Sequence, residues 1–383
     1  MEGGALVSLT WEQVAAWRMQ AQGLVERAPA SAWLSVVERV CGLHAQVMSS
    51  AELTLHARVD GLPPDAVSSA LWSDRSLVKT WAMRGTLHLL PSEEYPLWRA
   101  ALGQFEHYRR DGWLRGWGVT REEMETLIDG VAVALDGDPL TREALGAEIE
   151  RVTGSAHIGE IVRGSWGSML KPAAYEGKLC FGPSEGQKVT FTRPDAWLSV
   201  PDTPRDSESA LREVTRRFLA ANGPATRGDY ARWWGVTPAK AGRRILDLGD
   251  ESESVEVDGE PRFMLAGASA ETAACAPAGV VRLVPAFDQY VVGATLHAGS
   301  LLPSEDLRAR VYRAQGWLSP VLLVDGRMEG LWRFERKGRR IAIAIEPFRP
   351  QGAEVRAAAE AEAERIASFL GGEMRLEWAA APT

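Results

Sequence analysis

The sequence predicts an α+β fold in which a unit of three helices and a β-hairpin occurs three times, followed by a strand-rich carboxy-terminal domain. Apolar residues recur at helical spacing in runs that begin at Ser, Thr or Asp. Short apolar runs that flank turn residues follow the helices of each unit. The chain has 383 residues, too many for one compact core, which also favours several modules.

The first unit opens at Thr10, because a threonine with Gln13 three residues later is typical of a capping box. A second helix is expected from about Ser31, and it leads into the segment Cys41–Ser50. A third helix, a short fourth helix and two strands joined at Arg84-Gly85 should follow, at residues 52–59, 66–71, 77–83 and 86–90.

The second and third units repeat this order. The pattern Pro139-Leu140-Thr141-Arg142 returns 85 residues later as Pro224-Ala225-Thr226-Arg227, each time at the start of a second helix. The helices and hairpin strands of the second unit are expected at residues 121–135, 141–152, 164–175, 179–181 and 188–192. Those of the third are expected at residues 207–221, 226–234, 237–248, 255–257 and 262–265.

Three helices with a hairpin wing are the winged-helix arrangement, so three tandem winged helices are predicted. After about residue 279 the pattern changes to strands, expected at 280–285, 290–293, 321–324, 328–333, 340–345 and 375–378, with a helix at 353–370. The predicted domains are therefore a first winged helix, a second, a third and a strand-rich domain, at residues 1–118, 119–205, 206–270 and 271–383.

Composition points to a cytoplasmic protein. No run of about 18 apolar residues is present, the first residues do not resemble a signal peptide, and the three cysteines are far apart. The six histidines are not at metal-ligand spacing, and sequence patterns for nucleotide binding, zinc proteases and serine hydrolases are absent, so neither a cofactor nor a metal is expected. The net charge of −8 does not exclude DNA binding, which needs only one basic face.

The segment Cys41–Ser50 places His44 and Gln46 two positions apart in an apolar context. On an α-helix such residues lie about 200° apart and cannot hold one water molecule between them. We therefore predict that the helix ends at or before Gln46, so that both side chains can point the same way.

Four motifs, in order over nearly the whole chain, resemble the AlkZ-like family of bacterial DNA glycosylases with tandem winged helices. These motifs are Gly42-Leu43-His44-Ala45-Gln46, Met83-Arg84-Gly85-Thr86-Leu87-His88-Leu89, Pro285-Ala286-Phe287-Asp288-Gln289-Tyr290, and Val324-Asp325-Gly326-Arg327 with Gly330-Leu331-Trp332-Arg333. In that family a polar-x-polar pair, commonly Gln-x-Gln, is catalytic. Here His44 takes the first position, which resembles the subset tied to self-resistance against intercalating DNA alkylators.

The resemblance implies that His44 and Gln46 are catalytic, in a monofunctional glycosylase that hydrolyses the N-glycosidic bond of bulky N7-alkylguanine. The partner would be double-stranded DNA that carries the alkylated guanine, with no membrane, and the protein a monomer without a cofactor. Gln46 can accept from a water and donate to sugar or phosphate, whereas His44 could also take a proton. Without the resemblance, a histidine near a helix end is more often structural.

Further residues are candidate DNA contacts. They are basic or hydroxylic side chains on the first wing or on the third helices, namely Arg84, Thr86, Lys171, Lys240, Arg243 and Arg244. Solvated loop and helix positions are the equal alternative for the charged residues. Asp288 and Gln289 are either structural turn residues, which we favour, or face the DNA. The tryptophans are mostly expected in the core.

Two other functions fit the predicted fold. One is a non-catalytic winged-helix transcriptional regulator that binds DNA or a small drug, and the other is a structural interaction module. Replacement of His44 and Gln46 by alanine separates the glycosylase from the regulator.

Overall fold

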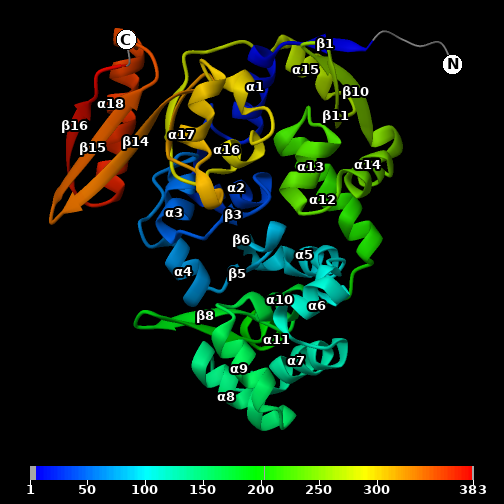
Figure 1. Cartoon of the computed structure of the whole chain (residues 1–383). Coiled ribbons are helices and arrows are strands. Elements are labelled where there is room, and N and C mark those ends of the chain that lie inside the picture. The colour runs from blue at the N-terminus through cyan, green and yellow to red at the C-terminus, as the bar shows by residue number, and fades with distance from the viewer. Residues whose placement is uncertain (1–5, 202, 382–383) are drawn as a thin grey trace. The chain divides into compact units, whose positions relative to one another are not determined.

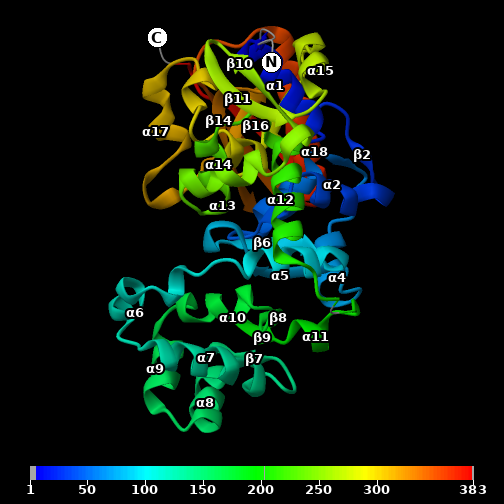
Figure 2. The ribbon, with the colours of Figure 1, turned by 90° about the vertical axis from the view of Figure 1, so that its right-hand side faces the viewer.

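The computed structural model describes residues 6–201 and 203–381 and divides into two compact units (Figures 1 and 2). The first unit joins the chain up to residue 64 with residues from 215 onwards, and the second is residues 65–214. The expected α+β class is confirmed. The expected boundaries at 118, 205 and 270 fall inside these units, so the four-domain division stays a prediction. Within the described residues, no helix is long and apolar enough to cross a membrane.

The first unit begins with strand β1 (Val7–Leu9) and helix α1 (Trp11–Ala21). The predicted capping box is present, because the Thr10 side chain accepts from the amide of Gln13 and the Gln13 side chain accepts from the amide of Thr10. Four short elements follow, which are β2 (Ala28–Pro29), α2 (Trp33–Arg39), α3 (Met48–His56) and β4 (Val59–Asp60).

The third repeat has the expected helices and hairpin. They are α12 (Ser207–Asn222), α13 (Arg227–Trp234), α14 (Pro238–Leu246), β10 (Ser252–Val257) and β11 (Glu260–Leu265). Gly235, with φ of 97°, ends α13 in the left-handed region that glycine tolerates best. Strand β1 adds to the hairpin, parallel to β10, and α15 (Ala268–Ala274) follows β11.

The carboxy-terminal part of the first unit is a five-stranded sheet in the order β12-β13-β14-β15-β16. Its strands are β12 (Val281–Val284), β13 (Val321–Val324), β14 (Arg327–Lys337), β15 (Arg340–Pro347) and β16 (Glu373–Trp378). Helix α18 (Ala353–Phe369) covers the sheet, as Figure 1 shows, and its apolar side packs on Ile341, Ile343 and Ile345. Between β12 and β13 lie α16 (Gln289–Gly293) and α17 (Arg308–Val311).

The second unit opens with α4 (Ala66–Trp72) and the predicted hairpin. Strands β5 (Leu77–Trp81) and β6 (Leu87–Pro91) pair antiparallel. The remaining elements are α5 (Tyr95–Leu102), α6 (Asp111–Trp117), α7 (Arg121–Ala134), β7 (Leu140–Thr141), α8 (Arg142–Thr153), α9 (Ala156–Gly164), α10 (Lys171–Tyr175), β8 (Cys180–Glu185), β9 (Lys188–Thr192) and α11 (Pro194–Trp197).

The internal repeat predicted between the second and third winged helices is confirmed at the level of single hydrogen bonds. Thr141 and Thr226 are both N-caps, and each accepts through its hydroxyl from the amide three residues later. The residue before each cap pairs with the second strand of the following hairpin, Leu140 with Phe191 and Ala225 with Phe263. A shared sequence pattern therefore marks a shared turn into the second helix.

Two predicted elements were wrong. Residues 290–293, expected as a strand, belong to helix α16, because the Asp288 carboxylate accepts from the amide of Tyr290 and caps the helix. The single helix expected over 164–175 is interrupted, because Trp166 and Gly167 both have positive φ. The third helix of the second repeat is instead α9. Lys171 is therefore not on that third helix but on α10, which follows it.

Candidate active site

The chain reverses sharply just before His44. Helix α2 ends at Arg39, and Cys41 and Gly42 then take positive φ values of 61° and 87°. Leu43 and His44 form the short strand β3, and α3 does not begin until Met48. The prediction that the helix ends at or before Gln46 is confirmed.

An extended backbone changes which side chains can act together. Alternate residues of a strand face the same side, so the angle of about 200° that a helix would impose no longer separates the two polar groups. Leu43 and Ala45 are buried, His44 is only 5% exposed, and Gln46 is exposed. The buried His44 side chain and the exposed Gln46 side chain thus lie two positions apart in the non-helical segment between α2 and α3.

An aromatic ring fixes the plane of the His44 side chain. Phe287 stacks on the imidazole, with ring centroids 4.7 Å apart and an angle of 8° between the planes. Phe287 has a φ of 61°, an unusual value for a bulky residue, and it also makes an edge-to-face contact with Trp317, with ring centroids 5.0 Å apart. Because the stack covers one face of the imidazole, polar partners can approach only at its nitrogen-bearing edge or its opposite face.

Gln289, two residues after Phe287, stabilises the turn that precedes His44. Gln289 Nε2 donates to the carbonyl oxygen of Gly42 at 2.6 Å, and the hydrogen bond is buried. A buried carbonyl left without a donor costs about 1–3 kcal/mol. This bond therefore stabilises the reversed chain at Gly42.

A buried ion pair joins the third motif to the residues that follow α3. Asp288 receives two hydrogen bonds from Arg58, at 2.7 and 2.8 Å, and both side chains are fully buried. Arg58 lies just beyond α3 and also donates to the backbone oxygens of Gln22 and Thr54. Gln289 therefore contacts the chain before His44, Phe287 contacts His44 itself, and Asp288 contacts the chain after α3. These contacts agree with the structural role that we favoured for Asp288 and Gln289.

The third motif is bonded in turn to the fourth. Tyr290 donates from its hydroxyl to the carbonyl oxygen of Gly326 at 2.9 Å, and Trp332 donates from its indole to the oxygen of Val284 at 2.7 Å. The Asp325 carboxylate accepts from the amides of Ala278 and Val280. The polar groups of Tyr290, Trp332 and Asp325 are thus used in hydrogen bonds within the fold.

The structure brings together three of the predicted DNA-binding residues. Arg84 and Thr86 flank Gly85 in the turn between β5 and β6, and the Thr86 hydroxyl donates to the oxygen of Met83. A Cβ added at Gly85 would lie 3.4 Å from Lys171 Nζ, so the lysine packs against this turn. Burial lowers the pKa of Lys171, and none of the described residues forms an ion pair with it.

The other three predicted residues lie in the first unit on α14. Lys240 and Arg243 are exposed and one turn apart on this helix. Arg244 is partly buried and lies 3.6 Å from Asp247. Among these three, Lys240 and Arg243 are therefore the side chains best placed to meet a phosphate.

The comparisons with known proteins all identify DNA glycosylases. The family described as "DNA glycosylase AlkZ-like" matches residues 37–369. An interstrand DNA cross-link repair glycosylase of Streptomyces sahachiroi is 38% identical over 371 residues, which covers 94% of this chain and 97% of the relative. The solved structure of the S. sahachiroi DNA glycosylase AlkZ matches with a TM-score of 0.86 and 34% identity, over 97% of this chain and all of that one.

The chain belongs to the AlkZ-like DNA glycosylase family. It is therefore an enzyme of DNA repair that hydrolyses N-glycosyl bonds, with DNA as its substrate. In this AlkZ-like glycosylase the histidine of the polar pair stacks on Phe287 of the third motif. Sequence reasoning found the third motif but not its contact with His44, because Phe287 and His44 are far apart in the chain.

A second buried histidine is unsuited to the same role. His297 Nδ1 lies 3.2 Å from Asp229 Oδ1, its Nε2 accepts from Arg18, and its ring stacks on Trp11. Burial and the nearby Arg18 charge lower the pKa of His297 to about 4. Both of its ring nitrogens are thus occupied within the fold. Among residues 6–201 and 203–381, no group of three or more His, Cys, Asp or Glu could hold a metal ion.

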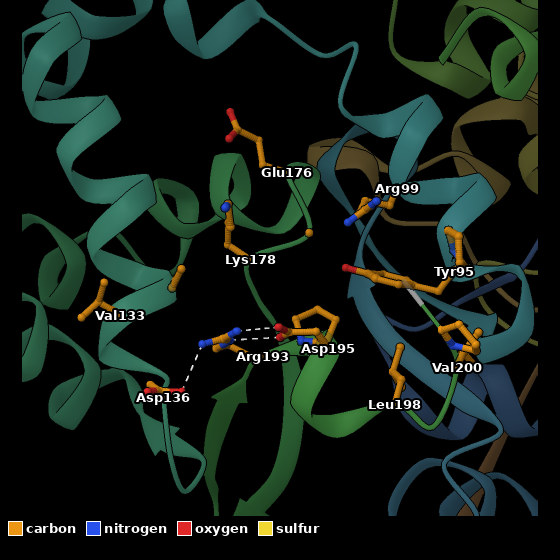
Figure 3. A pocket seen from close by; sticks show the side chains of 15 residues that line it. Tyr95, Arg99, Val133, Asp136, Glu176, Lys178, Arg193, Asp195, Leu198 and Val200 are labelled. Atoms are coloured by element: carbon orange, nitrogen blue, oxygen red, sulfur yellow. Dashed lines mark hydrogen bonds and ion pairs between the residues drawn. The ribbon is translucent and has the colours of Figure 1, made fainter. Parts of the chain in front are cut away.

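The second unit of the glycosylase contains a cavity of about 320 Å³ (Figure 3). Tyr95, Leu198 and Val200 line one side of it, and Arg193 bridges Asp195 and Asp136 on the other. None of the predicted site residues lines this cavity. Its acidic and basic groups largely neutralise one another, so it does not supply the basic surface that DNA requires.

Proposed function

We propose that this glycosylase removes bulky N7-alkylguanine from duplex DNA, including guanines joined in interstrand crosslinks, and leaves an abasic site. The proposal extends to this chain the crosslink-repair role named for the S. sahachiroi relative. It also draws on the His-x-Gln variant of the polar pair, from which we infer self-resistance to an intercalating, alkylating natural product. We expect a cytoplasmic monomer with the four domains predicted from the sequence.

Hydrolysis of the N-glycosidic bond of N7-alkylguanine mainly requires that the protein position a water and a few polar side chains. A guanine alkylated at N7 carries a positive charge and is already a good leaving group. The enzyme must hold a water at C1′ and stabilise a state that resembles an oxocarbenium ion. In our proposal Gln46 accepts from that water and donates to the sugar or phosphate, and His44 accepts the water's second hydrogen and takes the proton.

One observation carries the proposal. The turn before His44 and the plane of the His44 ring are held by Gln289 and Phe287 of one other motif, and Asp288 between them bonds Arg58 just beyond α3. A histidine that served only to end a helix would need none of these contacts. Preorganisation of this kind is what a water-positioning group requires.

The test is base release from duplexes that carry a graded series of N7-guanine adducts, from methyl to a large intercalator, with one crosslinked duplex. We expect the wild type to release the bulky bases and leave strands that break at abasic sites on heating. His44→Ala should lose at least about a hundredfold in rate. Gln104→Ala, an exposed glutamine outside the site, is the control. Release of none of the adducts would contradict the proposal, and preference for methyl alone would contradict the substrate class.

A further inference from the structure

The largest exposed apolar side chain in the described residues is Trp166, which is 87% exposed. It lies between α9 and the turn that leads to α10, with φ of 52°, and Gly167 follows with φ of 85°. Its indole N–H makes no hydrogen bond with any described residue. An isolated protein gains nothing from a large ring held in water by a backbone conformation that non-glycine residues seldom adopt.

The turn that presents Trp166 is firmly anchored. A Cβ added at Gly167 would lie 2.9 Å from the ring of Trp81, so the backbone packs directly on that buried tryptophan. Trp81 packs in turn on Phe181 and Phe191. Ser168 donates from its amide to the oxygen of Ser165, which closes the turn. The exposed ring therefore projects from a rigid support.

A cation accompanies the ring. The guanidinium of Arg142, at the start of α8, lies 5.1 Å from the centre of the Trp166 ring. Arg142 forms no ion pair with any described residue, and its buried Nε has no hydrogen-bond partner among them. A guanidinium without a described carboxylate partner, beside an exposed tryptophan, has the chemistry to bind a phosphate next to a flat ring.

The pair is continuous with the predicted DNA contacts of the second unit. Lys171 follows Trp166 by five residues and packs against the Gly85 turn beside Arg84. Lys79 lies on β5 two residues before Trp81, and burial lowers its pKa. No described carboxylate pairs with Lys79, Lys171 or Arg142, so this part of the unit carries uncompensated positive charge. Charge complementarity therefore favours a nucleic acid over a basic or neutral protein surface.

We propose that Trp166 and Arg142 form a DNA-contact site, in which the indole stacks on a base unstacked from the duplex and the guanidinium binds an adjacent phosphate. This inference rests on the proposed function, since a bulky adduct distorts the duplex and exposes base faces. Base–aromatic stacking tolerates any sequence, which suits an enzyme directed by damage. The exposed face of α9 is a weaker candidate for contact with DNA, because Glu160 is exposed on it and Arg163 pairs with Glu150.

The test measures affinity of the full chain for a fluorescent duplex with a central tetrahydrofuran abasic-site analogue, and for the intact duplex. Trp166→Ala should weaken binding to the analogue about tenfold, and Trp166→Phe should retain most of it. Arg142→Gln should weaken binding to both duplexes and reduce the slope of log affinity against log salt by about one. Trp117→Ala, a second exposed tryptophan of the same unit, is the matched control and should bind as the wild type does.

The outcomes separate this site from the proposed function. Unchanged affinity in both Trp166 variants overturns the site, whatever base release shows. Weakened binding in an enzyme that releases no adduct supports the site and rejects the proposed substrate. Loss of self-association on sedimentation, with DNA affinity unchanged, assigns Trp166 to a protein interface and overturns the proposal.

Discussion

At the scale of single residues, the position of His44 depends on Phe287. The two rings are nearly parallel at 4.7 Å, and the fold contains a similar pair, His56 with Phe369 at 4.6 Å. Stacking of this kind contributes about 0.5–1.5 kcal/mol beyond the area it buries. The first pair contains the proposed catalytic histidine and the second does not, so they form a natural comparison.

Phe287→Leu should slow base release about tenfold while DNA affinity stays unchanged, because loss of the stack lets the His44 ring rotate. The measurement is the single-turnover rate at saturating enzyme. Phe369→Leu removes the equivalent stack elsewhere and should lower only stability. Equal rates in the wild type and Phe287→Leu would show that the stack does not position His44.

The second stacked histidine makes stability depend on pH. Burial, with Arg365 and Arg27 nearby, lowers the pKa of His56 from 6.5 to about 4. Between these values the unfolded chain binds a proton that the folded chain does not, so stability falls as the pH falls through this window. At pH 5 the loss is about 2 kcal/mol.

His56→Phe should therefore lose about 2 kcal/mol less than the wild type when the pH is lowered from 7 to 5. The His56 Nε2 atom has no hydrogen-bond partner among the described residues, so phenylalanine leaves no group there unpaired. Urea unfolding at the two pH values measures the difference, with the exposed His157→Phe as control. A pH dependence identical to that of the wild type would rule out His56 as its source.

At the scale of elements, local signals predicted most of the helices and hairpins. The threonines at positions 10, 120, 141 and 226 all cap helices where the pattern placed them. Helix α16 was missed because Tyr290, Val291 and Val292 read as a strand, and only the capping role of Asp288 shows otherwise. Helix α9 was missed because Gly159 and Gly164 interrupt its pattern.

The ion pair between Arg58 and Asp288 joins α3 to α16, so its loss should be felt across both elements. Arg58→Met strands a buried carboxylate and should cost about 3–5 kcal/mol in the free energy of unfolding. Adding Asp288→Leu removes that stranded charge, so the double variant should be more stable than Arg58→Met alone. Denaturant unfolding of Arg58→Met, Asp288→Leu and the double variant checks this, and a double variant with the summed loss of the two single variants would argue against the pair.

At the scale of the whole molecule, an overall charge of −8 must be reconciled with a DNA substrate. Local groups such as Lys240 and Arg243 on α14 can supply the contacts, because net charge does not fix the charge of one face. Neither side chain pairs with a described carboxylate.

Lys240→Gln with Arg243→Gln should reduce the slope of log affinity against log salt by about two, one for each lost phosphate contact. Binding to an unmodified duplex at several salt concentrations measures this slope. Lys337→Gln with Arg339→Gln changes the net charge equally at exposed positions of the β14–β15 turn. If the control alters the slope as much, the effect is one of net charge and α14 does not bind phosphate.

The sequence could identify the polar pair but not the structure that holds it. His44 and Gln46 lie two positions apart in the chain, and helical geometry alone predicted that the helix ends at or before Gln46. The bond from Gln289 to Gly42 spans 247 residues, and no local pattern encodes such a contact. For the same reason Arg58 gave no signal, since an arginine after a helix is usually solvated.

The central claim is that His44 and Gln46 hold one water for attack at C1′. The decisive measurement is a double-mutant cycle of His44→Ala and Gln46→Ala, using single-turnover release of a bulky N7-alkylguanine at saturating enzyme. If both residues act on one water, each single variant should lose about a hundredfold or more and the double variant little beyond the worse single variant. Rates equal to the wild type, or losses that multiply in the double variant, would contradict the account.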